Sequence, residues 1–257
     1  MKRPYFMHTL YIGSAFAAMA LATAAHAASV RFDTLEALWT NPTGGSSIVM
    51  TPSYDDPATI RWGIPHMSGT GEKSGYEFDA VDTPFIRPAD DVFALGRFTH
   101  FNKVINLGTG ISSVELFLKA DIVLIPDAGP EVSLGENIFR FLVKHDETPN
   151  VAPCLPGSVS VCDDAVSITA LDTSDMVLID GTEYTLSILG FSYTVADAEA
   201  GIFDSEFLSP ENGTNTRVLA ATFSVAGNNP APVPLPAGLP MLLAGLGLMR
   251  IRKGKPG

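Results

Sequence analysis

Three histidines between residues 28 and 232, namely His66, His100 and His145, are the first candidates for metal binding or acid–base chemistry. None belongs to a His-x-His or His-Glu-x2-His pattern, so the sequence contains no local signature of a zinc site. His100 follows an apolar segment, which is typical of a hydrogen-bonding residue at a strand end. His145 begins the segment His-Asp-Glu-Thr-Pro-Asn, where Asp146 and Glu147 could help it orient a sugar or hold calcium. A turn is the simpler reading, because Asp, Asn and Pro are turn formers.

The 28 acidic residues include adjacent pairs, among them Asp55-Asp56, Asp90-Asp91 and Asp163-Asp164. Glycosidases use two carboxylates as general acid and as base or nucleophile. Adjacent acids on a strand point to opposite faces, however, and no pair stands out from the rest. The chain also lacks a Gly-x-Ser-x-Gly motif and a calcium-loop motif. We therefore predict no catalytic residue, no metal ligand and no cofactor, and we do not expect an enzyme. A secreted hydrolase is the second alternative function.

Aromatic residues offer a better argument for binding. Tyr54, Trp39, Trp62 and Tyr76 lie in the N-terminal third, among Asn, Asp, Thr and Gly residues. Aromatic faces that stack on sugar rings, flanked by polar groups, would form a glycan-binding platform. The alternative is that the tryptophans fill the protein core. A carbohydrate-binding module is accordingly the first alternative function.

Cys154 and Cys162 are the only cysteines. An even number of cysteines indicates a disulfide if the chain matures in an oxidising compartment, as the N-terminal segment described below predicts. The intervening Pro-Gly-Ser segment can turn back on itself. Two thiolates alone are a poor metal site. We predict a Cys154–Cys162 bridge that stabilises a surface loop by about 2–3 kcal/mol.

Alternating apolar residues with a period of two dominate the central part of the chain, as in residues 114–124, 139–144 and 219–225. Tyr184–Phe191 is another β-prone run. Turn-forming clusters separate these segments, including 41–45, 127–130 and 180–181. Only Val195–Ile202 is expected to form one or two helical turns. The sequence predicts an all-β fold, an antiparallel two-sheet sandwich resembling a jelly roll, with an N-terminal signal helix and a C-terminal hydrophobic helix.

The first 27 residues have the pattern of a secretory signal peptide. Lys2 and Arg3 precede an apolar run from Leu10 to Ala24, and Ala25-His26-Ala27 fits the small-x-small cleavage pattern. The mature chain is expected to begin at Ala28, with one domain over residues 28–226 and a linker over 227–232.

The last 25 residues contain a second targeting pattern. Val233-Pro234-Leu235-Pro236-Ala237 precedes an apolar run that ends at Met249, followed by Arg250, Arg252, Lys253 and Lys255. Apolar residues followed by a basic cluster form a membrane stop with a positive inner end. The apolar run is shorter than the roughly 17–25 residues of a comfortable span. A temporary stop therefore fits better than the alternative, a permanent anchor.

This tail, residues 233–257, resembles the VPLPA variant of the PEP-CTERM sorting signals of exported proteins in Gram-negative bacteria. The resemblance implies a membrane-embedded exosortase-type transpeptidase as a partner, which cuts at the Pro-containing motif and passes the body to a surface acceptor. Ile251 and Gly254 depart from an unbroken basic cluster. The C-terminal helix would lie in the inner membrane only transiently.

The body resembles the choice-of-anchor K domain over nearly all of residues 30–226. The resemblance rests on segments that occur in order: Trp39-Thr40-Asn41-Pro42, residues 60–65, 74–78, 93–102 and 145–150, and Cys162-Asp163-Asp164. It implies a surface-displayed bacterial domain and brings no catalytic residues with it.

Charge restricts the partners further. Six of the 16 basic residues lie in the terminal segments, so the body carries 10 basic and 28 acidic residues, a net charge of −18. Such a surface disfavours nucleic acid and anionic lipid. We expect an exported protein that passes through the inner membrane to the outer surface or extracellular matrix, as a structural or adhesive protein linked to exopolysaccharide or biofilm. Extracellular polysaccharide is a candidate partner.

Overall fold

The computed structural model describes residues 29–225 except 53, 55, 56, 127, 128, 161, 172–176, 180 and 181. The predicted signal peptide with Ala25 and Ala27, the linker, the sorting motif, the basic cluster and both terminal helices therefore lie outside the described residues. Within them, no helix has the length and apolarity needed to cross a membrane.

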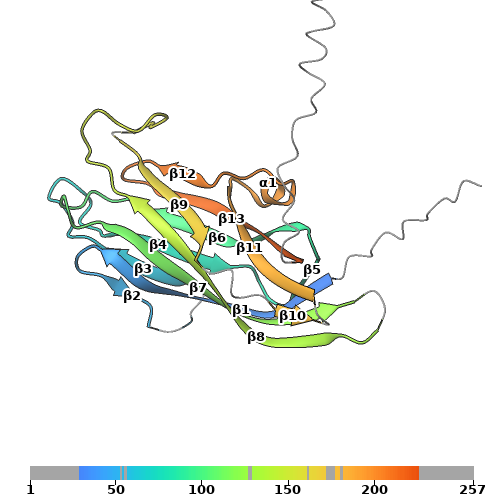
Figure 1. The fold of residues 1–257 in the computed structure, drawn as a ribbon. Coiled ribbons are helices and arrows are strands. Elements are labelled where there is room, and N and C mark those ends of the chain that lie inside the picture. The colour runs from blue at the N-terminus through green and yellow to red at the C-terminus, as the bar shows by residue number, and fades with distance from the viewer. Residues whose placement is uncertain are drawn as a thin grey trace, which may run out of the picture.

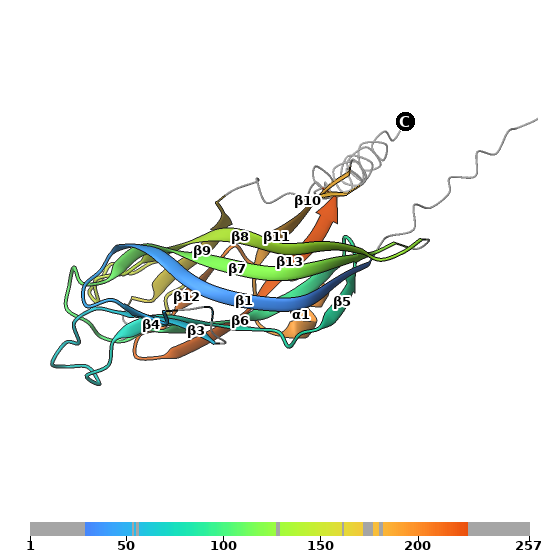
Figure 2. The same cartoon turned by 90° about the horizontal axis from the view of Figure 1, so that it is seen from below.

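Two antiparallel sheets pack face to face, which confirms the predicted sandwich (Figures 1 and 2). The six-stranded sheet has the order β12-β9-β8-β7-β1-β5, and its strands are β12 (Glu206–Ser209), β9 (Asp164–Ala170), β8 (Val132–Asp146), β7 (Ile111–Ile125), β1 (Ser29–Gly44) and β5 (Phe85–Pro88). The seven-stranded sheet has the order β10-β11-β13-β6-β4-β3-β2, and its strands are β10 (Val177–Ile179), β11 (Thr182–Ser192), β13 (Thr214–Val225), β6 (Val92–Phe101), β4 (Ser74–Ala80), β3 (Ala58–Trp62) and β2 (Val49–Met50).

The period-two pattern places the core between the sheets. In β7 the alternating residues from Val114 to Ile122 are fully buried, and in β8 Phe139, Phe141 and Val143 point the same way. β13 contributes Leu219, Ala221 and Phe223 from the opposite sheet. Apolar side chains on alternate positions share one face of a strand, so burying that face drives the two sheets together.

The one helix of the described part, α1 (Val195–Glu199), confirms the helical turns predicted over Val195–Ile202. Thr194 begins the helix as N-cap in a capping box with Asp197. Ala198 packs with Val218 and Ala220 on the outer face of the seven-stranded sheet, so small residues allow the helix to approach the strands closely.

Two predicted boundaries are wrong. Residues 41–44 are not a separate turn, because β1 continues to Gly44 through register shifts, with Asn41 at positive φ (50°). His145 does not follow β8 but belongs to it, as β8 ends at Asp146. In both places turn-forming residues are accommodated in a strand whose partners already fix its path.

The two ends of the described body lie at the same end of the sandwich. Ser29 pairs with Pro88, and the carbonyl of Phe223 accepts a hydrogen bond from the neighbouring Asp90 N–H. β6 begins beside this end, at Val92, and runs to the opposite end, where His100 lies about 26 Å further along at ~3.3 Å per residue. The described chain ends therefore lie at one end of the sandwich, and His100 lies at the other.

Candidate functional site

A group of ionisable side chains, the histidine–acid cluster, lies between the two sheets at the end of the sandwich away from the chain ends. It consists of His100 on β6, His145 on β8, Asp164 at the start of β9, Glu147 just after β8, and Glu211 in the turn between β12 and β13. His100 and Asp164 are fully buried, and His145 is 6% exposed. Four segments distant in sequence thus bring two imidazoles and three carboxylates together.

Strand geometry explains why both imidazoles point inward. His100 follows Phe98 by two residues, and His145 follows Val143 by two residues, so each occupies the next inward position of its strand. The two rings lie 5.1 Å apart between centroids, almost perpendicular to each other. Trp62 stacks on His100 and meets the edge of His145, so an aromatic wall encloses both histidines.

A hydroxyl group holds the Nδ1 atom of each histidine. Tyr76 Oη lies 2.6 Å from His145 Nδ1, and Ser209 Oγ lies 2.7 Å from His100 Nδ1. Ser209 Oγ also accepts a hydrogen bond from Asn215 Nδ2 at 2.7 Å. These contacts fix the orientation of both rings and direct their Nε2 atoms away from the hydroxyls.

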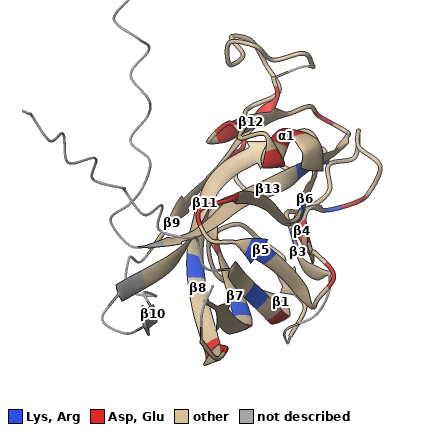
Figure 3. Cartoon of the chain, turned by 90° about the vertical axis from the view of Figure 1, so that its right-hand side faces the viewer, with Lys and Arg blue, Asp and Glu red and all other residues tan. Residues whose placement is uncertain are grey.

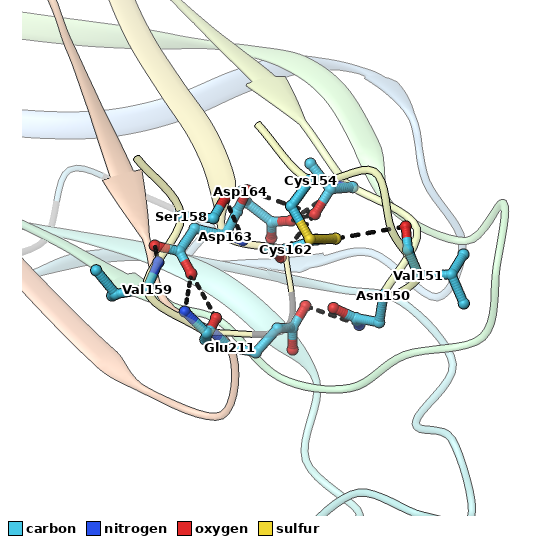
Figure 4. Close-up of a disulfide and its surroundings, with 11 residues drawn as sticks. Asn150, Val151, Cys154, Ser158, Val159, Cys162, Asp163, Asp164 and Glu211 are labelled. Carbon is cyan, nitrogen blue, oxygen red and sulfur yellow. Dashed lines mark hydrogen bonds between the residues drawn. A yellow bond between two sulfur atoms is a disulfide. The ribbon is translucent and has the colours of Figure 1, made fainter. Parts of the chain in front are cut away.

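The carboxylates meet the histidines on the Nε2 side. His145 Nε2 lies 3.2 Å from Glu147 Oε2 and 3.8 Å from Asp164 Oδ2. Asp164 Oδ1 accepts hydrogen bonds from the backbone and side chain of Thr148, at 2.9 and 3.2 Å. Glu211 Oε1 accepts one from Asn150 Nδ2 at 2.9 Å (Figure 4). One oxygen of each acid is thereby anchored or directed by the protein.

Several buried atoms of the cluster have no hydrogen-bond partner among the described residues: His100 Nε2, Asp164 Oδ2 and Glu211 Oε2. Buried polar atoms are usually paired, because leaving one unpaired costs about 1–3 kcal/mol. Three such atoms therefore lie in this one cluster, although others occur elsewhere in the described core, at Thr40, Thr222 and Ser224.

Burial dominates the electrostatics. It lowers the pKa of His100 well below its usual value, with His145 adding to the effect, and it lowers the pKa of His145 against the attraction of Asp164. Both imidazoles are therefore neutral at pH 7.

The pKa values of the three acids shift upward. Burial and the charge of Glu211 raise the pKa of Glu147 to about 7. The nearby Trp62 indole N–H acts in the opposite direction and lowers the pKa of Glu147, although its Nε1 makes no hydrogen bond to the carboxylate. Burial and the charge of Glu147 raise the pKa of Asp164 to about 8, against the attraction of His145, and burial also raises the pKa of Glu211. Three acids that repel one another in a dry site resist ionisation unless a positive charge joins them.

The predicted disulfide is present and lies beside the cluster, in the loop between β8 and β9. Cys154 and Cys162 are bonded, with their Cα atoms 4.6 Å apart (Figure 4). Asp163 organises the loop by accepting hydrogen bonds from the backbone of Val159 and Ser160 and from the Ser160 hydroxyl. The adjacent acids therefore separate as expected, Asp163 toward the loop and Asp164 toward the cluster.

The predicted glycan platform is wrong for three of its four residues. Trp39, Trp62 and Tyr76 do lie together, with ring centroids 4.8–5.7 Å apart in the contacting pairs, but each is at most 1% exposed. Tyr54 is half-buried and contacts Lys119 instead. Apolar burial between the sheets outweighs any exposed arrangement of these rings, so they cannot stack on a sugar.

The other sequence-based expectations have mixed outcomes. His100 is indeed a hydrogen-bonded residue at a strand end. Asp146 is exposed and does not join Glu147, because it occupies the outward position next to His145. His66 lies in an exposed loop, where its ring contacts Ser68. Asp55 and Asp56 lie outside the described residues.

The surface offers shallow cavities rather than a cleft that leads to the cluster. A groove of about 450 Å³ on the outer face of the six-stranded sheet is lined by residues that include Lys144, His145 and Asp146. The side chain of His145 is nevertheless fully buried. A second cavity of about 350 Å³ lies between Tyr193, Arg217 and the disulfide loop. Neither of these two cavities is lined by Glu147, Asp164 or Glu211. Within the cluster, Glu147 and Glu211 are partly exposed, whereas the side chains of His145 and Asp164 are buried.

Comparison with known proteins adds no assignment: no family model matches the chain, and no curated protein matches it.

Proposed function

We propose that the chain is an exported surface protein, processed at both ends, whose β-sandwich serves a structural or adhesive role in an exopolysaccharide or biofilm matrix. On this proposal it belongs with the choice-of-anchor K domains and carries a VPLPA-type PEP-CTERM signal read by an exosortase-type transpeptidase. The proposal rests on the C-terminal sequence, in which a sorting motif, a short apolar run and a basic end follow one another.

The described body supports this proposal in two ways. Its two cysteines are joined, which is compatible with an oxidising compartment outside the cytoplasm. Its chain ends meet at one end of the sandwich, so a body attached through its C-terminus would present the disulfide loop at the far end.

Surface charge is consistent with a soluble, displayed domain. Basic residues on β1, β5, β7 and β8 are paired with acids, as Arg31 is with Asp33 and Glu131, and Lys119 with Glu36 (Figure 3). Acidic residues gather around β12 and α1. The excess of negative charge favours solubility and excludes anionic partners.

Fractionation of the cell envelope tests the sorting step. A chain truncated after residue 232 should be released into the periplasm or medium, because it lacks the membrane stop. The double variant Pro234→Ala/Pro236→Ala keeps the apolar run but loses the motif, and it should accumulate in the inner membrane with its tail uncut.

The matched control is Pro230→Ala/Pro232→Ala, which changes two linker prolines outside the motif and should be sorted like the wild type. If Pro234→Ala/Pro236→Ala is also sorted normally, the motif is not a transpeptidase signal. If the truncated and intact chains fractionate alike, the tail is not a targeting element at all.

A further inference from the structure

The histidine–acid cluster brings three carboxyl groups together without a Lys or Arg partner. Glu147, Asp164 and Glu211 each place a carboxylate oxygen within 4.8 Å of the other two. Across the described ranges, no Lys or Arg forms an ion pair with any of them, and only His145 lies within ion-pair distance of Glu147 and Asp164. A divalent cation would give these carboxyl groups a positive partner.

The donor atoms form two groups that share Asp164, and the atoms of each group lie within 4.8 Å of one another. One ligand atom from each of His100, His145 and Asp164 lies within 4.8 Å of the other two. Two donors that each lie about 2.0–2.2 Å from a zinc ion are at most about 4.4 Å apart. The separations of His145 Nε2 from Glu147 Oε2 and Asp164 Oδ2, 3.2 and 3.8 Å, fall inside that limit.

The surroundings of the two imidazoles match those of metal ligands. Metal-binding histidines usually engage their second ring nitrogen in a hydrogen bond that fixes the ring and its tautomer. Here Tyr76 and Ser209 occupy the Nδ1 atoms, while His100 Nε2 has no partner within the described structure. Asp164 likewise has Oδ1 anchored by Thr148 and Oδ2 unpartnered. Both unpartnered atoms are buried, as the ligand atoms of an internal metal site would be.

We propose that His100, His145 and Asp164 bind a divalent transition-metal ion of the zinc class, with Glu147 and Glu211 as oxygen ligands on its solvent side. Two imidazoles with carboxylates favour zinc over calcium and magnesium, which prefer oxygen ligands alone. In the bound form His145 Nδ1 donates to Tyr76 Oη, which leaves the Nε2 lone pair for the ion. Glu147 and Glu211, the partly exposed members, provide the route from solvent.

Such an ion would link the two sheets directly through side chains. His100 belongs to the seven-stranded sheet, His145 and Asp164 belong to the six-stranded sheet, and Glu211 precedes the crossing from one to the other. The disulfide loop lies beside it, since Glu211 N–H donates to Ser160 Oγ at 3.0 Å. The ion would therefore hold the far end of the sandwich closed, independently of how the chain is sorted.

Zinc binding and thermal unfolding of the protein purified from its host, in the form that the host delivers, test the proposal. After dialysis against EDTA, titration with Zn²⁺ alone should show one site. The melting temperature should rise by roughly 5–10 °C at a zinc concentration about 100 times Kd. Ca²⁺ alone and Mg²⁺ alone should produce no comparable rise.

Two adjacent acids provide a matched pair of variants. Asp164→Asn keeps the shape of a proposed ligand and should weaken zinc binding by at least about 100-fold, more than the 10–100-fold typical of outer-shell changes. Asp163→Asn alters an acid whose oxygens are taken by the disulfide loop, so it should bind zinc like the wild type while melting at a lower temperature.

Zinc affinity in Asp164→Asn equal to that of the wild type would overturn the proposal. So would a wild-type chain that binds no zinc and melts alike with and without EDTA, or one stabilised by Ca²⁺ but not by Zn²⁺. Should Asp164→Asn fail to fold, zinc K-edge absorption on the wild-type protein decides the matter. The proposal requires the scattering of two imidazoles, and a spectrum without imidazole contradicts it.

Discussion

The imidazole of His145 lies between the phenol of Tyr76 and two carboxylates, which contact different nitrogen atoms of the ring. Tyr76 Oη holds Nδ1 at 2.6 Å, while Glu147 and Asp164 face Nε2. Burial lowers the pKa of the ring, and it raises the pKa values of both acids. The hydrogen bond with the phenol fixes the orientation of the ring.

Removing the hydroxyl of Tyr76 tests how much its hydrogen bond to His145 contributes to stability. In Tyr76→Phe the ring still packs against Trp62 and Phe98, but His145 Nδ1 loses its buried partner. The variant should lower the free energy of unfolding by about 1–3 kcal/mol. Urea unfolding in EDTA measures this without any contribution from bound metal.

Tyr54→Phe is the matched control, because Tyr54 lies half-buried beside Lys119 and away from the cluster. It should change the free energy of unfolding by less than about 0.5 kcal/mol. Equal effects of the two substitutions would show that the Tyr76–His145 hydrogen bond contributes nothing specific.

At the scale of elements, alternation along strands was sufficient to predict much of the fold. The inward positions of β7, β8 and β13 follow directly from the sequence, because burial selects apolar residues at every second position. The same alternation, continued two residues past Val143, places His145 in the interior. The alternation therefore predicts an inward His145, but the turn-forming residues that follow it favoured a turn at this position.

The cluster as a whole was not predictable from local patterns. Its members come from segments as far apart as His100 and Glu211, and zinc motifs on one helix or hairpin have no counterpart here. Only strand order and register bring β6, β8 and β9 to a common end, and neither follows from periodicity. The buried aromatic trio illustrates the same limit, since clustering in sequence correctly indicated proximity but not exposure.

The loop between β8 and β9 depends on the disulfide and on Asp163. Replacing both cysteines, as in Cys154→Ser/Cys162→Ser, should cost about 2–3 kcal/mol through the greater entropy of the unfolded chain. The sheets should remain folded, because the closed loop contributes no core strand. Denaturant unfolding compared with the wild type measures the cost, and the circular dichroism of the variant reports the strands.

Wild-type protein treated with reductant is the control, and it should unfold at the same denaturant concentration as the double variant. A double variant as stable as the oxidised wild type would show that the bridge does not constrain the loop.

At the scale of the whole molecule, the described chain ends and the histidine–acid cluster lie at opposite ends of the sandwich. The chain enters and leaves near Ser29 and Val225, at the end where the predicted linker and tail connect. The histidine–acid cluster and the disulfide loop occupy the opposite end (Figure 1). A domain attached at the first end would present the second to its surroundings, and a metal ion and a disulfide would both stabilise that distal end against unfolding.

Intact-mass analysis of the chain recovered from the surface of its own host tests the central claim most directly. The proposal predicts that residues 1–27 and the C-terminal tail are absent, so that the chain begins at Ala28. It also predicts that alkylation without reductant adds no label to Cys154 or Cys162. A chain recovered with residues 1–257 intact and two alkylated cysteines would contradict export, processing and the oxidising compartment together.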